Sequence, residues 1–135
     1  MSIPSQGGET ILVVEQEPAA RATLCRTLRA EGYQVIPVGR GLDTQWCAER
    51  HASRLHLLVA ELAVPESDHY HLGIPLTRLL SSTPVIFTSR EPRETHVRRG
   101  LLHPAAPFLR TPASPAVIAR IVRRILDRSG AATMM

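Results

Sequence analysis

The chain has 135 residues, of which 44% are hydrophobic, and a formal net charge of +4. This length fits one domain around one core, the apolar content argues against a disordered chain, and no apolar run approaches the roughly 20 residues of a membrane helix. Because residues 1–10 lack the basic start and apolar segment of a signal peptide, we expect a cytoplasmic protein with reduced thiols at Cys25 and Cys47.

Strand and helix patterns alternate along the chain. Short apolar runs rich in β-branched residues predict strands over 10–15, 33–38, 55–62, 84–89 and 106–110. Pro37 indicates that the second strand lies near a sheet edge. Helical patterns predict a helix from Pro18 to a stop at Gly32, and others over 42–51, 70–80 and part of 91–103. Ser114 is the expected N-cap of a last helix that begins at Pro115.

This alternation predicts a parallel sheet with helices on both faces. In such folds ligands meet the carboxyl ends of the strands. The residues expected at those ends are Glu15, Gln16, Glu17, Glu61, Ser89, Arg110 and Thr111. We therefore expect the chemistry of this chain at that edge of the sheet.

Four segments resemble the response-regulator receiver domain, in family order and with family spacing. They are ILVVEQEP, LLVAELAVPE, PVIFTSR and APFLRTPASPAVIARIVRRIL. The resemblance implies an α/β receiver fold of the flavodoxin-like type, with a five-stranded, doubly wound parallel sheet in the order 2-1-3-4-5. It places the domain at 9–129, between a disordered or extended N-terminus over 1–8 and a C-terminal tail over 130–135.

The family's phosphorylation site is altered at four of five positions. The resemblance places Glu61 at the phosphoacceptor Asp, Glu15 and Gln16 at the acidic pair that holds Mg²⁺, and Thr111 at the Lys, while Ser89 matches the switch hydroxyl. The chain contains no Lys at all. Phosphoryl transfer depends on positioning and charge neutralisation, and Gln is a poor ligand for Mg²⁺. We therefore expect no normal Asp phosphorylation, no cofactor and weak or absent Mg²⁺ binding.

Other interpretations stay open at this point. The altered residues are also compatible with neutral drift that retains activity, and the acids with ordinary solvated side chains. An atypical phosphoacceptor could use Glu61, Glu15 or Glu17. Glu61 could also mimic a phosphorylated state, although one carboxylate brings less charge than a phosphoryl group.

Two further positions bear on switching. Phe108 corresponds to the family's switch aromatic, and packing alone is an equally good interpretation. Arg90 stands where the family has a small residue. It could cover the site or pair with Glu61 or Glu15, or it could simply face solvent.

Basic residues gather in the C-terminal half, where residues 90–135 hold nine Arg against three acids. The resemblance places six of them on the family's partner and dimer surface: Arg98, Arg99, Arg110, Arg120, Arg123 and Arg124. Such a surface suits an acidic protein partner. A basic nucleic-acid-associated adaptor is the alternative, but the sequence contains no groove-reading motif.

These observations predict a stand-alone pseudo-receiver that acts by protein–protein interaction and is not an enzyme. The expected partner is a signalling protein such as a histidine kinase or another regulator. A homodimer stays open, nucleic acid is disfavoured, and no membrane association is expected.

Overall fold

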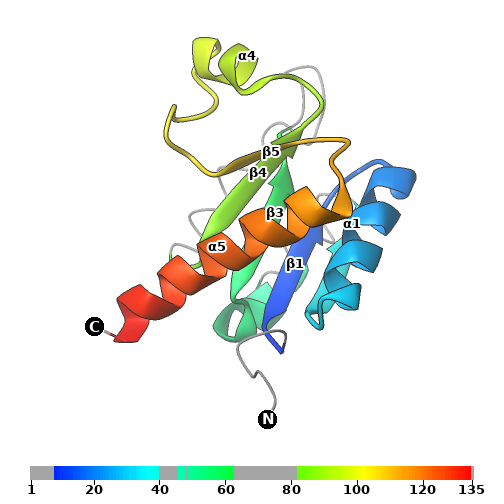
Figure 1. Ribbon diagram of the computed structural model, residues 1–135, viewed down its shortest axis with the longest axis vertical. Helices are drawn as coiled ribbons and strands as arrows, with labels where there is room; N and C mark the ends of the chain where they lie inside the picture. Colours follow the sequence, from blue (N-terminus) through cyan, green and yellow to red (C-terminus); the bar gives the residue numbers. More distant parts are fainter. Residues whose placement is uncertain (1–7, 40–45, 48, 63–81, 135) are drawn as a thin grey trace.

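The computed structural model describes residues 8–39, 46–47, 49–62 and 82–134, without the side chains of residues 52 and 130–134. Its centre is a parallel sheet in the order β2-β1-β3-β4-β5 (Figure 1). The strands are β1 (Thr10–Val14), β2 (Gln34–Val38), β3 (Leu57–Glu61), β4 (Val85–Ser89) and β5 (Phe108–Arg110). This confirms the predicted fold class and strand order, and it places Pro37 on the edge strand β2, where its missing N–H costs no sheet bond.

The helices are α1 (Pro18–Ala30), α4 (Arg93–Arg98) and α5 (Pro115–Met134), with a short 3₁₀ turn, η1, over Ala52–Arg54. Within the second predicted helix, 42–51, residues 46, 47 and 49–51 are helical. The third predicted helix, 70–80, lies outside the described residues. None of the helices in the described part of the chain is both long and apolar enough to cross a membrane.

The sheet separates two apolar layers, because alternate residues of a strand face opposite sides. On one side α1 and α5 (Figure 1) pack against residues such as Ile11, Val13 and Ile86. On the other side Leu12 and Leu58 belong to a second cluster. Burying each such side chain stabilises the fold by about 1.5–3 kcal/mol. The two-sided burial explains why β1 and β3 read as continuous apolar runs.

The helix ends follow the capping rules that the sequence suggested. The Glu17 carboxylate accepts hydrogen bonds from the backbone N–H groups of Ala19 and Ala20, directly before α1. At the other end of α1, Gly32 has a φ of +95°, which glycine adopts without strain. Ser114 Oγ accepts from the N–H of Val117 and caps α5 as predicted.

The C-terminal tail predicted over 130–135 is a correction, because α5 continues as a helix to Met134. The prediction placed the end of the domain at residue 129. One glycine costs a helix only about 1 kcal/mol relative to Ala, and the two Ala residues that follow are the best helix formers.

Arg123 occupies a different environment from the other basic residues predicted for the interaction surface. Its guanidinium pairs with Glu9 at 2.8 Å and with Asp127 at 2.9 Å, and it donates to the Tyr33 hydroxyl at 3.2 Å. Hydrogen bonding to the Glu9 carboxylate raises the pKa of Arg123, and the bond to Asp127 adds to this effect. Arg123 therefore ties α5 to the segments that precede β1 and β2.

We predict that Arg123→Gln lowers the free energy of unfolding by about 1–3 kcal/mol, because the partly buried Glu9 carboxylate loses its partner. Urea unfolding measures this change. Arg124→Gln is the matched control, since Arg124 is exposed on the same helix, and we expect it to stay within about 0.5 kcal/mol of the unmodified protein. Equal effects of the two changes would show that the Arg123 contacts contribute nothing to stability.

Candidate functional site

The carboxyl ends of the central strands bring the predicted site residues to one edge of the sheet. Glu15 follows β1, Glu61 ends β3 and Ser89 ends β4. The register pairs Glu61 with Thr88 and Ser89 with Arg110 on the neighbouring strands. These side chains, which lie far apart in sequence, therefore form the edge that the sequence predicted.

The Glu61 carboxylate reaches the loop between β1 and α1. Its Oε1 accepts a hydrogen bond from the backbone N–H of Gln16 at 3.0 Å. The Gln16 residue itself is exposed, and Glu61 is half-buried. The long side chain of Glu61 thus joins the end of β3 to the loop after β1.

Glu15 is a buried acid, with 3% of its surface exposed, so it is not the solvated side chain that the sequence left open. Its Oε2 accepts from the N–H of Glu17 at 3.1 Å. The pKa of Glu15 is raised to about 7, first by burial and then by the charge of Glu61 and a hydrogen bond with it, while the hydrogen bond from the N–H of Glu17 opposes the shift. Near neutral pH, Glu15 therefore holds a proton about half of the time.

Arg21 anchors the same loop from within α1, a role that the sequence did not reveal. Its Nη1 donates to the carbonyl oxygens of Glu15 at 2.8 Å and Gln16 at 3.3 Å. The guanidinium lies close against Gly39, so that a Cβ at this position would require it to shift. Arg21 therefore fixes the backbone of the loop through its carbonyl oxygens. The carboxyl groups of Glu15 and Glu61 form a hydrogen bond with each other.

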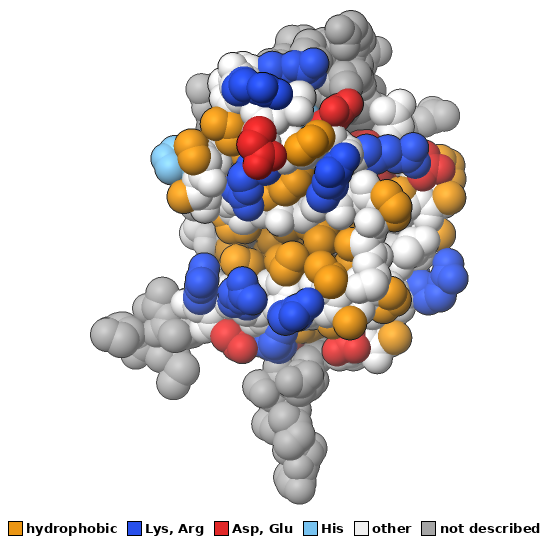
Figure 2. All heavy atoms as spheres, turned by 45° about the horizontal axis from the view of Figure 1, so that its top comes forward, with side chains coloured by type: hydrophobic (Ala, Val, Ile, Leu, Met, Phe, Trp, Pro, Cys, Tyr) orange, Lys and Arg blue, Asp and Glu red, His pale blue; other side chains and the backbone are white. Residues whose placement is uncertain are grey.

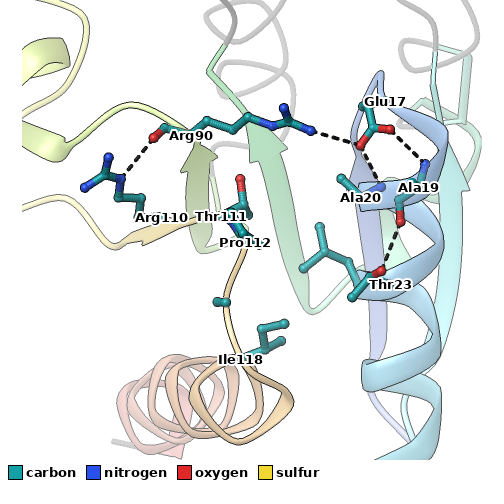
Figure 3. Close-up of a pocket in the computed structure, with 11 residues that line it drawn as sticks. Glu17, Ala19, Ala20, Thr23, Arg90, Arg110, Thr111, Pro112 and Ile118 are labelled. Atoms are coloured by element: carbon teal, nitrogen blue, oxygen red, sulfur yellow. Dashed lines mark hydrogen bonds and ion pairs between the residues drawn. The ribbon is translucent and has the colours of Figure 1, made fainter.

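Arg90 pairs with Glu17, and not with Glu61 or Glu15 as the sequence suggested. Its Nη2 lies 3.3 Å from Glu17 Oε1, and both side chains are largely open to solvent. Figure 3 shows Arg90 extended from the end of β4 toward the start of α1. The side chain is long enough to reach the N-cap of α1, where Glu17 already accepts two backbone bonds.

Arg110 ends β5 and Thr111 follows it, in the expected order. Arg110 is exposed and its Nε donates to the carbonyl oxygen of Arg90 at 2.9 Å. The Thr111 N–H donates to the carbonyl oxygen of Ser89, and the Thr111–Pro112 peptide bond is cis. Among the described residues, no ion pair reaches Glu61.

Ser89 is held by a buried histidine that sequence reasoning missed. Ser89 Oγ lies 2.7 Å from Nε2 of His96 and also accepts from the N–H of Glu91 at 3.0 Å. His96 is fully buried, and its Nδ1 has no partner. Burial, together with the positive charge of Arg99, lowers the pKa of His96, so the ring is neutral at physiological pH. A lone His within a polar run gives no sequence signal of such a contact.

Phe108 packs beside the same histidine. The two ring centroids are 6.2 Å apart, and the Arg93 guanidinium lies over the Phe108 ring at 5.4 Å. Arg93 also donates to the carbonyl oxygens of Pro104 and Ala106. The predicted switch residues Ser89 and Phe108 therefore both lie next to His96 of α4.

Within the residues that the structure describes, no cluster of three or more His, Cys, Asp or Glu side chains is placed to hold a metal ion. The sequence also places two His and one Asp close together at Asp68, His69 and His71, a pattern of low specificity for a metal site, and these three residues lie outside the described part of the chain. Both cysteines are free thiols, as expected.

The chain is similar to several signalling proteins. The two-component response regulator ORR3 of Oryza sativa subsp. indica is 25% identical over 118 residues, which cover 86% of this chain and 89% of that protein. The crystal structure of the receiver domain from the hybrid histidine kinase CckA is 29% identical with a TM-score of 0.66, and the match covers 87% of this chain and 98% of that one.

The chemotaxis protein CheY4 of Vibrio cholerae has the same fold. It superposes with a TM-score of 0.72 at 18% identity and covers 87% of this chain and 98% of its own. No family model matches the chain.

We predict that the stability of the protein decreases as pH rises through the range set by Glu15. Its pKa is about 7 in the folded state and 4.5 ordinarily, so the folded protein holds this proton more tightly. The contribution of this proton to the free energy of unfolding is complete below pH 4.5 and is lost as pH rises through 7. It amounts to about 3 kcal/mol at most. Glu15→Gln removes this dependence, because its amide stays neutral.

Urea unfolding across this pH range, compared with the unmodified protein at each pH, measures the effect and cancels other titrating groups. The gain from Glu15→Gln should grow with pH. Glu49→Gln is the control, since Glu49 is exposed, and its difference should not vary with pH. A pH-independent difference for Glu15→Gln would contradict a buried, protonated Glu15.

Proposed function

We propose that this chain, a homologue of response-regulator receiver domains, regulates other signalling proteins by binding them and does not undergo the phosphorylation typical of such domains. The receiver fold and the place of Glu61 at the end of β3 define where phosphorylation would occur. Four features of that edge support the proposal.

The observation that carries the proposal is the arrangement of Glu61, Gln16 and Glu15. A phosphoacceptor must present a free carboxylate oxygen to the incoming phosphorus. Here one Glu61 oxygen accepts from the Gln16 N–H, and the carboxylate also shares a hydrogen bond with Glu15. The nucleophile is therefore engaged within the protein, and it is one methylene longer than Asp. Displacements near 1 Å can cost about 100-fold in rate.

The donor set does not fit a Mg²⁺ ion. Mg²⁺ prefers several oxygen ligands in strict octahedral geometry and is held through carboxylates. Glu15 is half protonated near neutral pH, and metal binding requires its deprotonation. Gln16 contributes only a neutral amide, and its side chain belongs to an exposed residue. We therefore assign no step of the function to a metal ion.

The cations of this edge are directed elsewhere. Phosphoryl transfer requires positive charge beside the transferred group. Thr111 is neutral, Arg90 pairs with Glu17, and Arg110 donates to the backbone of residue 90. Restoring phosphorylation therefore requires a new cation as well as a new nucleophile.

The contacts of Ser89 support a fixed conformation. A switch hydroxyl must be free to leave its partners when the phosphoryl group arrives. Ser89 has two partners, and one of them is the buried ring of His96. Moving Ser89 would leave a second unpartnered nitrogen on that ring, at a cost of about 1–3 kcal/mol. We infer that the protein presents one constant surface to its partner.

That surface is basic. Arg98 and Arg99 near the end of α4, Arg110 on β5, and Arg120 and Arg124 on α5 are exposed. Arg123 is excluded, because it is held by Glu9 and Asp127. Figure 2 shows Arg side chains in separate groups around a central apolar area of one face. The five exposed Arg residues suit an acidic surface on a signalling protein, such as a histidine kinase or another regulator.

We predict that the unmodified protein is not phosphorylated when it is incubated with Mg²⁺ and acetyl phosphate, as read by intact mass. The three lost groups act on one transition state, so their effects are non-additive. Glu61→Asp, Gln16→Asp and Thr111→Lys should each give little phosphorylation, and the triple variant should give a clear gain. Arg90→Ala is the fourth change to add if Arg90 obstructs the site. Phosphorylation of the unmodified protein would overturn the proposal, and phosphorylation of Glu61→Asp alone would show that side-chain length was the sole block.

We also predict that partner binding depends on Arg120 and Arg124. The protein is used to capture its partner from the native host, and the affinity is then measured at low and high salt. Arg120→Glu with Arg124→Glu should weaken binding and reduce its salt dependence, because exposed charge pairs are screened by salt. Arg26→Glu with Arg54→Glu is the matched control, since both residues are exposed elsewhere on the molecule. Equal binding by the two double variants would place the interface elsewhere.

A further inference from the structure

A groove lies between the first turns of α1 and the connection from β5 to α5, and Glu61 is not among its lining residues. Figure 3 shows it bounded by Ala20 and Thr23 on one wall and by Thr111 and Pro112 on the other. Its volume is about 690 Å³. Sites for small ligands typically measure about 300–1,000 Å³, so the groove is large enough to hold one.

The lower part of the groove is apolar. Leu24 from α1 and Ile118 from α5 line it, and both belong to the core. The nearby wall positions are Ala19, Ala20 and Ala113, whose side chains are too short to fill the space between the two helices. The hollow thus results from small residues on both walls, and its surface favours an apolar occupant.

The mouth of the groove carries two guanidinium groups. Arg90 and Arg110 line it together with Glu17, and Arg110 is oriented by the bond from its Nε to the Arg90 carbonyl oxygen. That bond leaves both Nη atoms of Arg110 without a hydrogen bond or ion pair to the described residues. A planar fork of this kind suits a carboxylate.

The pair between Arg90 and Glu17 is easily exchanged. The two atoms are 3.3 Å apart, and the side chains are 73% and 44% exposed, so the pair contributes little. Glu17 keeps its two backbone bonds to the start of α1 when Arg90 leaves. An anion at the mouth can therefore replace Glu17 as the partner of Arg90 at a small cost in free energy. The same anion can also bind Arg110.

We propose that this groove binds a small amphipathic organic acid, with its carboxylate at Arg90 and Arg110 and its apolar body between Ala20 and Ile118. The polar groups lie at one end of the hollow and the apolar groups at the other, which matches the polarity of such a molecule. The proposal does not depend on the phosphorylation state of the protein, because Glu61 does not line the groove.

Octanoate, below its micelle-forming concentration, is the probe, and the amide shifts of the full chain are the readout. We expect saturable shifts in the millimolar range or below, centred on Thr23, Leu24 and Ala113. Acetate lacks the apolar body and should give none. 1-Octanol lacks the charge and should bind at least roughly tenfold more weakly, because a charge-assisted hydrogen bond is lost.

Two filling variants test the location. Ala20→Leu and Ala113→Leu each place a larger side chain in the hollow from opposite walls and should abolish the octanoate shifts. Ala22→Leu is the control for the first, since Ala22 is exposed on α1 and does not line the groove. Thermal unfolding checks that each variant folds. If one of the two filling variants does not fold, the other one alone tests the location.

A charge variant tests the mouth. Arg110→Gln should weaken octanoate binding by roughly tenfold and leave 1-octanol unchanged, whereas Arg26→Gln should change neither. The proposal is overturned if octanoate gives no saturable shifts, if the filled variants bind it as well as the unmodified protein, or if 1-octanol binds as tightly as octanoate. Shifts located outside the groove would also overturn it.

Discussion

The hydrogen bond from the Gln16 N–H to the Glu61 carboxylate joins the two strand ends between which the chemistry of a receiver domain takes place. It exists because Glu61 is long enough to cross from the end of β3 to the loop after β1. Once Glu61 lies there, its charge falls beside the buried Glu15 and helps to raise the pKa of that acid to about 7. Arg21 holds the loop by donating hydrogen bonds to the backbone carbonyl oxygens of Glu15 and Gln16. The length of the Glu61 side chain thus lets its carboxylate bond to the Gln16 N–H, and its charge favours a proton on the neighbouring Glu15.

The charges of this edge are consistent with that arrangement. Two acids in close contact are tolerated when one of them holds a proton, and in our proposal this proton takes the role that a divalent cation has in an active receiver. The cations then serve other surfaces: Arg90 and Arg110 line the groove beside α1, and Arg110 together with the exposed Arg residues of α4 and α5 forms the proposed partner surface. In the proposed function, Ser89 stays bound to His96 because no phosphoryl group arrives at this edge. The proposal therefore gives the edge one fixed conformation.

The sequence predicted most of the fold, because strands, helix starts and helix stops depend on local chemistry. The apolar runs of β1 and β3, the edge position of Pro37 and the Ser114 cap are features of this kind. Partner choice by long side chains was not predictable, because Arg90 and Arg123 can reach several acids and only the folded chain decides which one lies nearest. His96 gave no signal, since a buried histidine and an exposed one look alike in a polar run. Residues 130–134 were misjudged because a single Gly130 does not end a helix.

The most direct test of the central claim is a Mg²⁺ titration at neutral pH, followed through the amide signals of Glu15, Gln16 and Glu61. A loop held by Glu61 and Arg21, with Glu15 half protonated, should show no saturable shifts at millimolar Mg²⁺. Gln16→Asp, which restores an anionic ligand, is the positive control and should gain such shifts. Saturable shifts clustered at these three residues in the unmodified protein would contradict the account, because they would show that the acidic edge still accepts a divalent cation.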